Sequence, residues 1–276
     1  MTQETAPDER QDEWQVDAVD VDAYLDLIGH PRNVPPSLES LTSLHEAHVL
    51  TVPFENVDVV LGQHPGVALD SIVAKLVDQR RGGYCFENAL LFAAVLERLG
   101  FTVSRRMSRV QPWRPGPATH MALVVPVDGQ EHLVDVGFGS GLLRPMPLRD
   151  GAEADQAGWR HRITRDGLLW TLSVQTTRGW TALHSLSPLP QHQVDYEMAH
   201  HYVATYPKSP FTGQLVVMRL APGVRRRLVG WTHTVEHPDG SRDERPVTPD
   251  ELGAVLAELG VHLATDRVNE LVRRLT

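Results

Sequence analysis

Gly100 marks a change in the hydrophobic pattern of the chain. Before it, apolar residues recur at helical spacing, and the apolar run over residues 85–99 predicts a buried helix that ends at Gly100. After it, short runs rich in β-branched residues are separated by turn residues, which is typical of strands. Helices first, strands next and a mixed end indicate an α+β fold, because β–α–β units would alternate throughout.

Three shorter helices are predicted upstream of Gly100. Asp20 and Asp70 are each placed to cap a helix, and Ser37, after two prolines, opens another. His45 and His48 lie in the helix after Ser37, but they are one residue short of the metalloprotease His-Glu-x-x-His spacing. We therefore expect both histidines on the surface of that helix, without a metal ion.

A hairpin is predicted at Asp128-Gly129, a pair that favours a tight two-residue turn. Two β-rich runs, residues 121–127 and 132–136, flank this turn. Alternation and capping residues predict further elements: strands at 170–175, 178–186, 215–220 and 228–234, a helix from Pro249 to about Gly260, and a last helix capped by Asp266.

The charge balance and the single cysteine exclude several classes of protein. Among 276 residues, 26 Lys and Arg against 35 Asp and Glu give a net charge of −9, which disfavours non-specific binding to nucleic acid. One cysteine permits no internal disulfide and no multi-cysteine zinc site. The N-terminal residues lack the basic and apolar parts of a signal peptide, and no apolar run is long enough to span a membrane. We therefore expect a cytoplasmic protein that binds neither membrane nor nucleic acid.

Residues 80–87 carry the most informative motif, Arg-Arg-Gly-Gly-Tyr-Cys-Phe-Glu. Its two glycines permit a tight turn close to a ligand, and Cys85 then falls in the first turn of the predicted helix. Free N–H groups and the positive end of the helix dipole favour a thiolate there, and the same N–H groups could hold an oxyanion. A lone cysteine is more often an inert packing residue, so a catalytic role for Cys85 requires a base nearby.

His120 and Asp135 supply such a base through the register of the hairpin. With Val127 opposite Gln130, Asp135 falls opposite Ala122. His120 lies on the same face two positions away, a diagonal separation of about 7–8 Å that a carboxylate-to-imidazole hydrogen bond can bridge. The spacing predicts an aspartate that orients a histidine, and a histidine that acts as base toward the thiol. The alternatives are a packing histidine and an aspartate that faces water.

Several motifs, in this order and spacing, make the chain resemble the arylamine N-acetyltransferase family. They are Val-Pro-Phe-Glu-Asn at 52–56, Arg-Gly-Gly-Tyr-Cys at 81–85, Thr-His at 119–120, Val-Asp-Val-Gly-Phe-Gly at 134–139 and, more loosely, Tyr-Pro-Lys-Ser-Pro-Phe at 206–211. The resemblance covers most of the chain. It places Cys85, His120 and Asp135 on the catalytic triad of the family.

The fold that the resemblance implies is a helical bundle, a central β-barrel and a C-terminal α/β lid. We assign the parts of the chain as a mobile acidic tail at 1–18, the bundle at 19–100, the barrel at 101–205 and the lid at 206–276. The resemblance also implies a structural ion pair between Glu55 and Arg81.

By the same resemblance the reaction is ping-pong: acetyl-CoA acylates the cysteine, CoA leaves, and an aromatic amine or hydrazine takes the acyl group. Phe54, Phe138 and Phe211 fall on positions that resemble the substrate pocket of the family. The backbone of Phe138 and Gly139 falls beside the path of the pantetheine arm. Acetyl-CoA is thus the expected co-substrate, and no metal is expected. Ordinary core packing is the alternative for each of these phenylalanines, above all for Phe54 and Phe211.

Two departures from the family pattern bear on the acyl donor. Asn88 directly follows Glu87, so Ala89 stands at the usual asparagine position, and Ser140-Gly141 alters the loop expected to meet the cofactor. The alternative function is therefore that of the related ansamycin amide synthases, which share the triad and close a macrolactam from a polyketide on an acyl carrier protein, without CoA. A cysteine hydrolase and a non-catalytic binding protein fit the motifs less well. A monomer and a homodimer both agree with the sequence.

Overall fold

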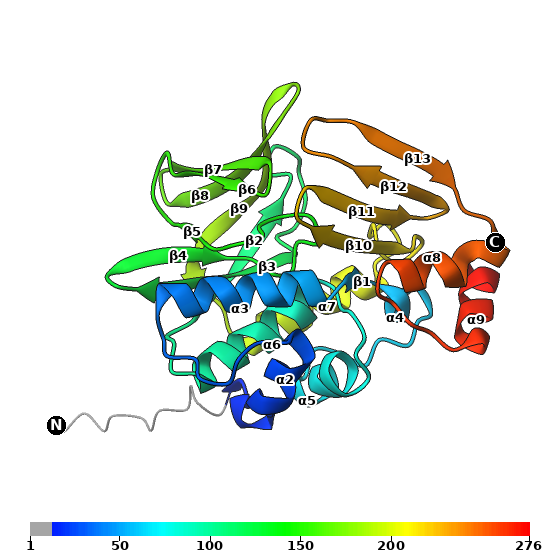
Figure 1. Cartoon of the computed structure of the whole chain (residues 1–276), viewed down its shortest axis with the longest axis horizontal. Coiled ribbons are helices and arrows are strands. Elements are labelled where there is room, and N and C mark those ends of the chain that lie inside the picture. Colours follow the sequence, from blue (N-terminus) through cyan, green and yellow to red (C-terminus); the bar gives the residue numbers. More distant parts are fainter. Residues whose placement is uncertain (1–12) are drawn as a thin grey trace.

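The computed structural model of the chain describes residues 13–276 (Figure 1). Most of the tail predicted at 1–18 lies outside these described residues. Its last part belongs to the folded protein, because Val16–Ala18 forms a short 3-10 helix and the ring of Trp14 lies 6.1 Å from that of Tyr196.

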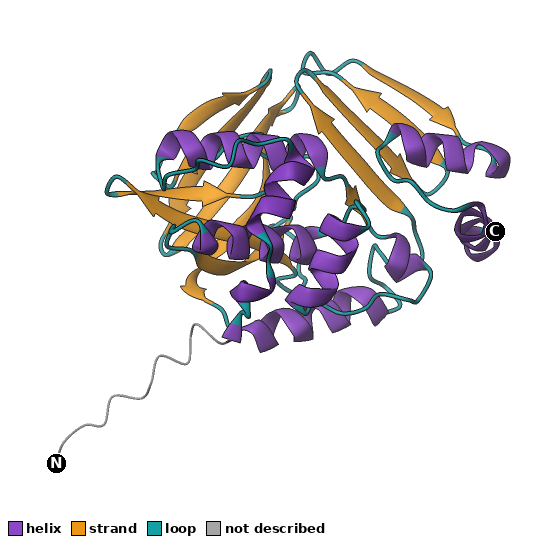
Figure 2. Ribbon diagram, turned by 60° about the horizontal axis from the view of Figure 1, so that its bottom comes forward, coloured by secondary structure: helices purple, strands orange, loops and turns teal. Residues whose placement is uncertain are grey.

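The first part of the chain is helical, and its helices pack around a central, buried helix (Figures 1 and 2). The elements are α2 (Val21–Ile28), α3 (Leu38–Thr51), α5 (Leu69–Val73), which continues as a π-helix (Ala74–Asp78), and α6 (Cys85–Arg98). The side chains of α6 from Cys85 to Leu96 are all buried. The prediction of a buried helix over 85–99 is thus confirmed. Gly100 follows it with a positive φ of 89°.

Two of the four predicted helix caps are confirmed and two are wrong. The side chains of Asp20 and Ser37 accept hydrogen bonds from backbone N–H groups in the first turns of α2 and α3. Asp70 and Asp266 instead lie inside the first turns of α5 and α9 (Thr265–Leu275), whose N-cap residues are alanines. An acidic side chain is favourable in either place, because the helix dipole stabilises negative charge throughout the first turn.

The central part of the chain forms an eight-stranded antiparallel sheet that curls into a nearly closed barrel. Its strands, in spatial order, are β5 (Met146–Pro147), β4 (Gln130–Val134), β3 (His120–Val127), β2 (Ser104–Val110), β9 (Gly179–Pro190), β8 (Leu169–Thr176), β7 (Trp159–Asp166) and β6 (Glu153–Gln156). Val127 pairs with Gln130 across the β3–β4 turn, which confirms the predicted register. Asp128 and Gly129 both have positive φ, as a type I′ turn requires.

The C-terminal part is built on a second, five-stranded sheet beside the barrel (Figure 1). Its strands are β1 (Phe54–Glu55), β10 (Val216–Ala221), β11 (Val224–Val229), β12 (Thr232–Glu236) and β13 (Arg242–Pro246). A short 3-10 helix (Pro249–Glu251) leads into α8 (Leu252–Glu258); α8, α9 and α4 (Val57–Val60) share one apolar core with this sheet. The single strand predicted at 228–234 is wrong, because Gly230 turns the chain between β11 and β12.

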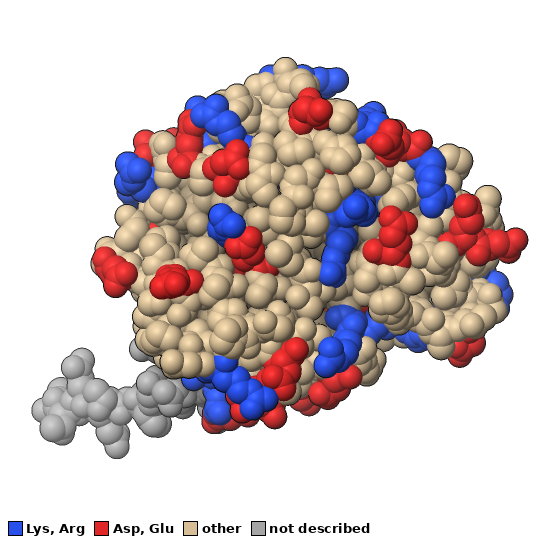
Figure 3. Space-filling view, in the orientation of Figure 1, with Lys and Arg blue, Asp and Glu red and all other residues tan. Residues whose placement is uncertain are grey.

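The predicted α+β fold, with helical bundle, barrel and α/β lid, is confirmed by this arrangement. Between barrel and second sheet, α7 (Gln193–Thr205) returns to the helical part, where Tyr196, Ala199 and Val203 are buried. The sequence limits of the three parts stay a prediction, and the lid sheet takes its edge strand, β1, from residues far upstream. Among the described helices, none combines the length and apolar character needed to cross a bilayer. Figure 3 shows basic and acidic side chains interspersed over one face.

Candidate active site

Cys85 is the first residue of α6, where the helix abuts the loop that follows β4. Its side chain is 5% exposed, and Sγ lies 3.7 Å from the carbonyl oxygen of Thr119, the residue before β3. Gly137 lies against the backbone of Cys85: a Cβ at this position would be only 2.7 Å from the Cys85 carbonyl oxygen. A residue with a side chain would therefore push the loop away from the cysteine.

The two glycines before Cys85 let the turn pack against the protein itself. A Cβ on Gly82 would lie 2.4 Å from the carbonyl oxygen of Pro53, and one on Gly83 would lie 2.8 Å from Cβ of Glu87. The Gly83 N–H donates to the Pro53 carbonyl at 3.2 Å. The contacts that exclude a side chain here are thus made by protein atoms, whereas the sequence led us to expect a ligand.

A buried ionic cluster holds the start of α6 in place. Glu87 accepts a hydrogen bond from the Tyr84 N–H at 3.0 Å. It also forms an ion pair with Lys75 Nζ at 2.8 Å. Burial alone would raise the pKa of Glu87, but Lys75 and His64 together outweigh it and the pKa falls to about 2. The predicted pair of Glu55 and Arg81 is confirmed, with Nη2 2.6 Å from Oε1. Lys75 was not identified from the sequence.

His120 and Asp135 meet as the hairpin register predicted. His120 Nε2 lies 2.8 Å from Asp135 Oδ2, and both side chains are buried. Burial would lower the pKa of His120, but the Asp135 carboxylate and the adjoining Cys85 side chain raise it to about 10. Burial would raise the pKa of Asp135, but His120 and a further histidine hold it well below its usual range. The structure therefore favours an imidazolium beside a carboxylate, with the cysteine close by.

Asp135 is fixed through its backbone as well as its side chain. Its N–H donates to His45 Nε2 at 3.2 Å, and its Oδ1 accepts the N–H of Gly137 at 3.2 Å. His45 Nδ1 in turn donates to the Leu143 carbonyl oxygen at 3.0 Å. One face of α3 thereby positions the aspartate.

The prediction that His45 and His48 lie on the helix surface is wrong, because both are fully buried. They continue the apolar face that Leu41 and Leu44 begin, at the spacing of one side of a helix. Burial lowers the pKa of His45 to about 4 and that of His48 to about 3, so both rings are neutral. Their spacing from the two leucines was the signal that could have placed them.

Asn88, next to the departure from the family pattern, secures the turn before the cysteine. Its Nδ2 donates to the Gly83 carbonyl oxygen at 2.6 Å, and its Oδ1 accepts from His48 Nε2 at 3.0 Å. Ala89 is buried in the core. The amide at position 88 therefore supplies a hydrogen bond to this turn although position 89 has none to offer.

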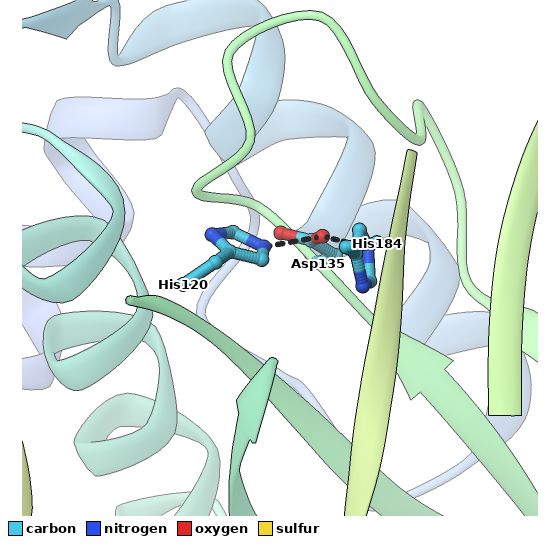
Figure 4. Close-up of side chains that lie close together, drawn as sticks. All are labelled: His120, Asp135 and His184. Carbon is cyan, nitrogen blue, oxygen red and sulfur yellow. Dashed lines mark hydrogen bonds and ion pairs between the residues drawn. The ribbon is translucent and has the colours of Figure 1, made fainter. Parts of the chain in front are cut away.

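His184, on β9, is a residue of the site that sequence reasoning missed. Its Nε2 lies 3.0 Å from the same oxygen of Asp135 that faces His120, and its Nδ1 lies 2.6 Å from Ser108 Oγ. Figure 4 shows the carboxylate between the two imidazole rings. Burial lowers the pKa of His184, so this ring is neutral. No motif marks His184, and only the pairing of β2 with β9 brings it to the hairpin.

The same three side chains offer two nitrogens and one oxygen, all within 4.8 Å of one another, which is a possible set of metal ligands. Their contacts of 2.8 and 3.0 Å are hydrogen-bond lengths. The shorter contact, between His120 Nε2 and Asp135 Oδ2, is a hydrogen bond.

The predicted aromatic residues fall into two adjacent groups. The ring of Phe138 lies 5.2 Å from that of His120 and 5.4 Å from that of His184. Phe54 and Phe211 lie together, with ring centroids 5.9 Å apart. Gly139, the residue after Phe138, packs against Phe54: a Cβ at Gly139 would lie 3.0 Å from the Phe54 side chain. Phe138 thus lies beside His120, whereas Phe54 and Phe211 lie at the turn before the cysteine, where Phe54 bridges to Gly83; the contacts of all three with substrate stay a prediction.

The raised pKa of His120 makes stability depend on pH. The pKa is about 10 in the folded state against 6.5 for a free histidine, so the stabilisation is complete below about pH 6.5 and is lost as pH rises toward 10. We expect the free energy of unfolding of Cys85→Ala, in which Asp135 still raises the pKa of His120, to fall as pH rises above about 7, by up to ~1.4 kcal/mol per pH unit, and more steeply than that of Cys85→Ala/His120→Gln. Urea titrations measure both, without a titrating thiol. Equal slopes would show that His120 is neutral in the folded protein.

Comparisons with known proteins agree with this geometry. A family model described as N-acetyltransferase matches residues 37–268. An arylamine N-acetyltransferase of Mycolicibacterium smegmatis is 36% identical over 256 residues, which cover 89% of this chain and 93% of the relative. The arylamine N-acetyltransferase structure from Mycobacterium abscessus superposes with a TM-score of 0.91 at 35% identity, covering 99% of both chains. That from Mycobacterium marinum in complex with CoA gives a TM-score of 0.86 at 30% identity, covering 93% of this chain and 98% of the other.

Proposed function

The chain belongs to the arylamine N-acetyltransferase family, and from this membership we propose that it moves an acetyl group from acetyl-CoA to an aromatic amine or hydrazine through a thioester on Cys85. The observation that carries the proposal is the buried 2.8 Å contact between His120 and Asp135 beside the only cysteine of the chain.

The first half-reaction starts from an ion pair in which His120 Nδ1 already holds the Cys85 proton, because Nε2 is engaged by Asp135. The thiolate attacks the carbonyl carbon of acetyl-CoA and forms a tetrahedral intermediate. Backbone N–H groups at the start of α6 stabilise its oxyanion. The C–S bond to CoA then breaks, and CoA leaves as a thiol with the proton that His120 returns.

In the second half-reaction, an aromatic amine attacks the thioester carbonyl carbon. His120 takes the proton that the nitrogen loses and returns it to the Cys85 sulfur as the C–S bond breaks. The products are the N-acetyl amine and the free cysteine. Phe54, Phe138 and Phe211 offer flat apolar surfaces that suit an aromatic ring, and the CoA complex of the Mycobacterium marinum relative supports the choice of donor.

The experiment is to offer the protein three acyl donors and measure its intact mass. We expect acetyl-CoA alone to add one acetyl group, which peptide mapping places on the peptide of Cys85 and which an aromatic amine removes as the N-acetyl product. The other donors are an acyl group on a carrier protein and a simple thioester mimic of a polyketide.

Each alternative predicts another result. Adducts from the carrier-bound or mimic donor, with none from acetyl-CoA, would establish an amide synthase and refute the proposal. Release of free acetate at the same rate with and without amine would establish a hydrolase. A folded protein that takes an acyl group from none of the donors would be no acyltransferase.

A further inference from the structure

We propose that His184, oriented by Ser108, is a positioning residue that holds Asp135 in the geometry needed to orient His120. The inference rests on the proposed function, because it assigns a role within the same catalytic site. It names a fourth and a fifth residue that act on the reaction without touching the substrate.

Asp135 Oδ2 contacts two histidine side chains. This single oxygen faces two imidazole nitrogens, His120 Nε2 at 2.8 Å and His184 Nε2 at 3.0 Å. All three side chains are at most 3% exposed, so water does not solvate the carboxylate in place of the rings. A buried carboxylate needs hydrogen-bond donors, and it stays charged only while it has them.

The position of the proton on His184 follows from the neighbours of its two nitrogens. As a neutral ring it carries one proton, on either Nδ1 or Nε2. If Nδ1 carried it, the bare Nε2 lone pair would face the Asp135 carboxylate and repel it. If Nε2 carries it, Ser108 Oγ–H donates to Nδ1 at 2.6 Å and the Nε2–H faces Asp135 Oδ2 at 3.0 Å, a favourable polar contact whose N–H is not aligned for a hydrogen bond. The Asp135 carboxylate, which can only accept, therefore selects the ring form, and Ser108 supplies the hydroxyl donor that this form needs at Nδ1.

Ser108 and His184 lie on regular strands of the barrel. Ser108 lies on β2 and His184 on β9, adjacent strands in which Ser108 pairs with Leu186 and Val110 with His184. Asp135, in contrast, lies in the irregular loop after β4. The two strands of the barrel thus anchor a carboxylate that its own segment holds less firmly. Phe138 packs on both imidazole rings and keeps their planes in place.

The test is the single-turnover rate of Cys85 acylation by acetyl-CoA in His184→Phe, measured by rapid quench and intact mass. Phenylalanine keeps the ring but removes both nitrogens. We expect the acylation rate constant to fall about ten- to a hundredfold, the loss of one polar contact to a charged group, while the acetyl-CoA concentration for half-maximal rate stays unchanged. His233→Phe replaces another buried histidine, on β12, and is the matched control with a wild-type rate.

Two further variants keep the inference testable if His184→Phe folds poorly. His184→Gln retains an amide N–H that reaches toward Asp135, and it should restore part of the rate. Ser108→Ala should slow acylation less than His184→Phe does, and it should have no additional effect in the His184→Phe background. The proton resonance of the His120–Asp135 hydrogen bond should shift in His184→Phe and in Ser108→Ala, but not in His233→Phe.

The outcomes separate this inference from the proposed function. A wild-type chain that takes no acetyl group refutes the proposed function and, with it, the role of His184. A wild-type chain that is acylated, with His184→Phe or Ser108→Ala within twofold of it, overturns the inference alone. A His184→Gln variant as slow as His184→Phe would also overturn it, because packing and not the polar contact would then be responsible.

Discussion

Replacement of Cys85 by alanine is expected to abolish acetyl transfer, with turnover falling by about 10^4-fold or more. The substitution removes the only thiol of the chain, so no thioester forms and the ping-pong path is closed. Cys85→Ser is expected to lose nearly as much, because a serine hydroxyl beside His120 does not ionise as a thiol does. Intact mass after incubation with acetyl-CoA, together with N-acetyl amine production, measures both variants.

The fold should survive the loss of this thiol. Cys85 lies at the start of α6, whose position is set by the Lys75–Glu87 pair and by the turn at Gly83, and none of these contacts uses the sulfur. We expect the free energy of unfolding to change by less than about 2 kcal/mol. Iodoacetamide, which should label wild type at one position and Cys85→Ala at none, provides a second readout. An alanine variant that still acetylates amines would remove Cys85 from the mechanism.

Replacement of Asp135 by asparagine is expected to lower turnover about 10^3- to 10^4-fold. The asparagine amide keeps one acceptor oxygen but replaces the other with an NH2 donor, so it opposes either the imidazole nitrogens or the Gly137 N–H. His120 then loses both its orientation and the charge that raises its pKa. The acylation rate at saturating acetyl-CoA is the quantity to measure, because binding of CoA should change little.

The hairpin itself offers the matched control. Asp128→Asn makes the same chemical change on an exposed turn residue between β3 and β4, at a position with a φ of 51° that suits asparagine as well as aspartate. We expect wild-type activity from it. If Asp135→Asn were also close to wild type, the aspartate would have no part in orienting the base.

The sequence was most informative where a function depends on local pattern. The turn residues Asp128-Gly129 set the register of one hairpin, and that register brought His120 and Asp135 together without any tertiary information. The start of α6 at Cys85 likewise followed from the glycines before it and the apolar run behind it. Both predictions concern residues close together along the chain.

The rest of the site depends on contacts that local pattern does not encode. His184 reaches Asp135 because β9 pairs with β2, a choice of neighbour made by the whole barrel. His45 and His48 were assigned to the surface because their spacing does not suit a metal site, yet hydrogen bonds to Asp135, Tyr24 and other partners satisfy both rings in the interior. Lys75 was likewise missed from the sequence, because its three carboxylate partners belong to other segments of the chain.

The position of β1 has a consequence for how the chain is made. Phe54 pairs with Met218, and the Asn56 side chain bonds to the backbone of Phe211, Gln214 and Val216, partners that lie 155 to 160 residues later in the chain. The same short segment bonds to the Gly83 turn before the cysteine. A ribosome that has synthesised the helices and the barrel has therefore produced Cys85 without all the contacts that support its turn. The site is completed only by the last quarter of translation, and a chain cut short before β10 would lack it.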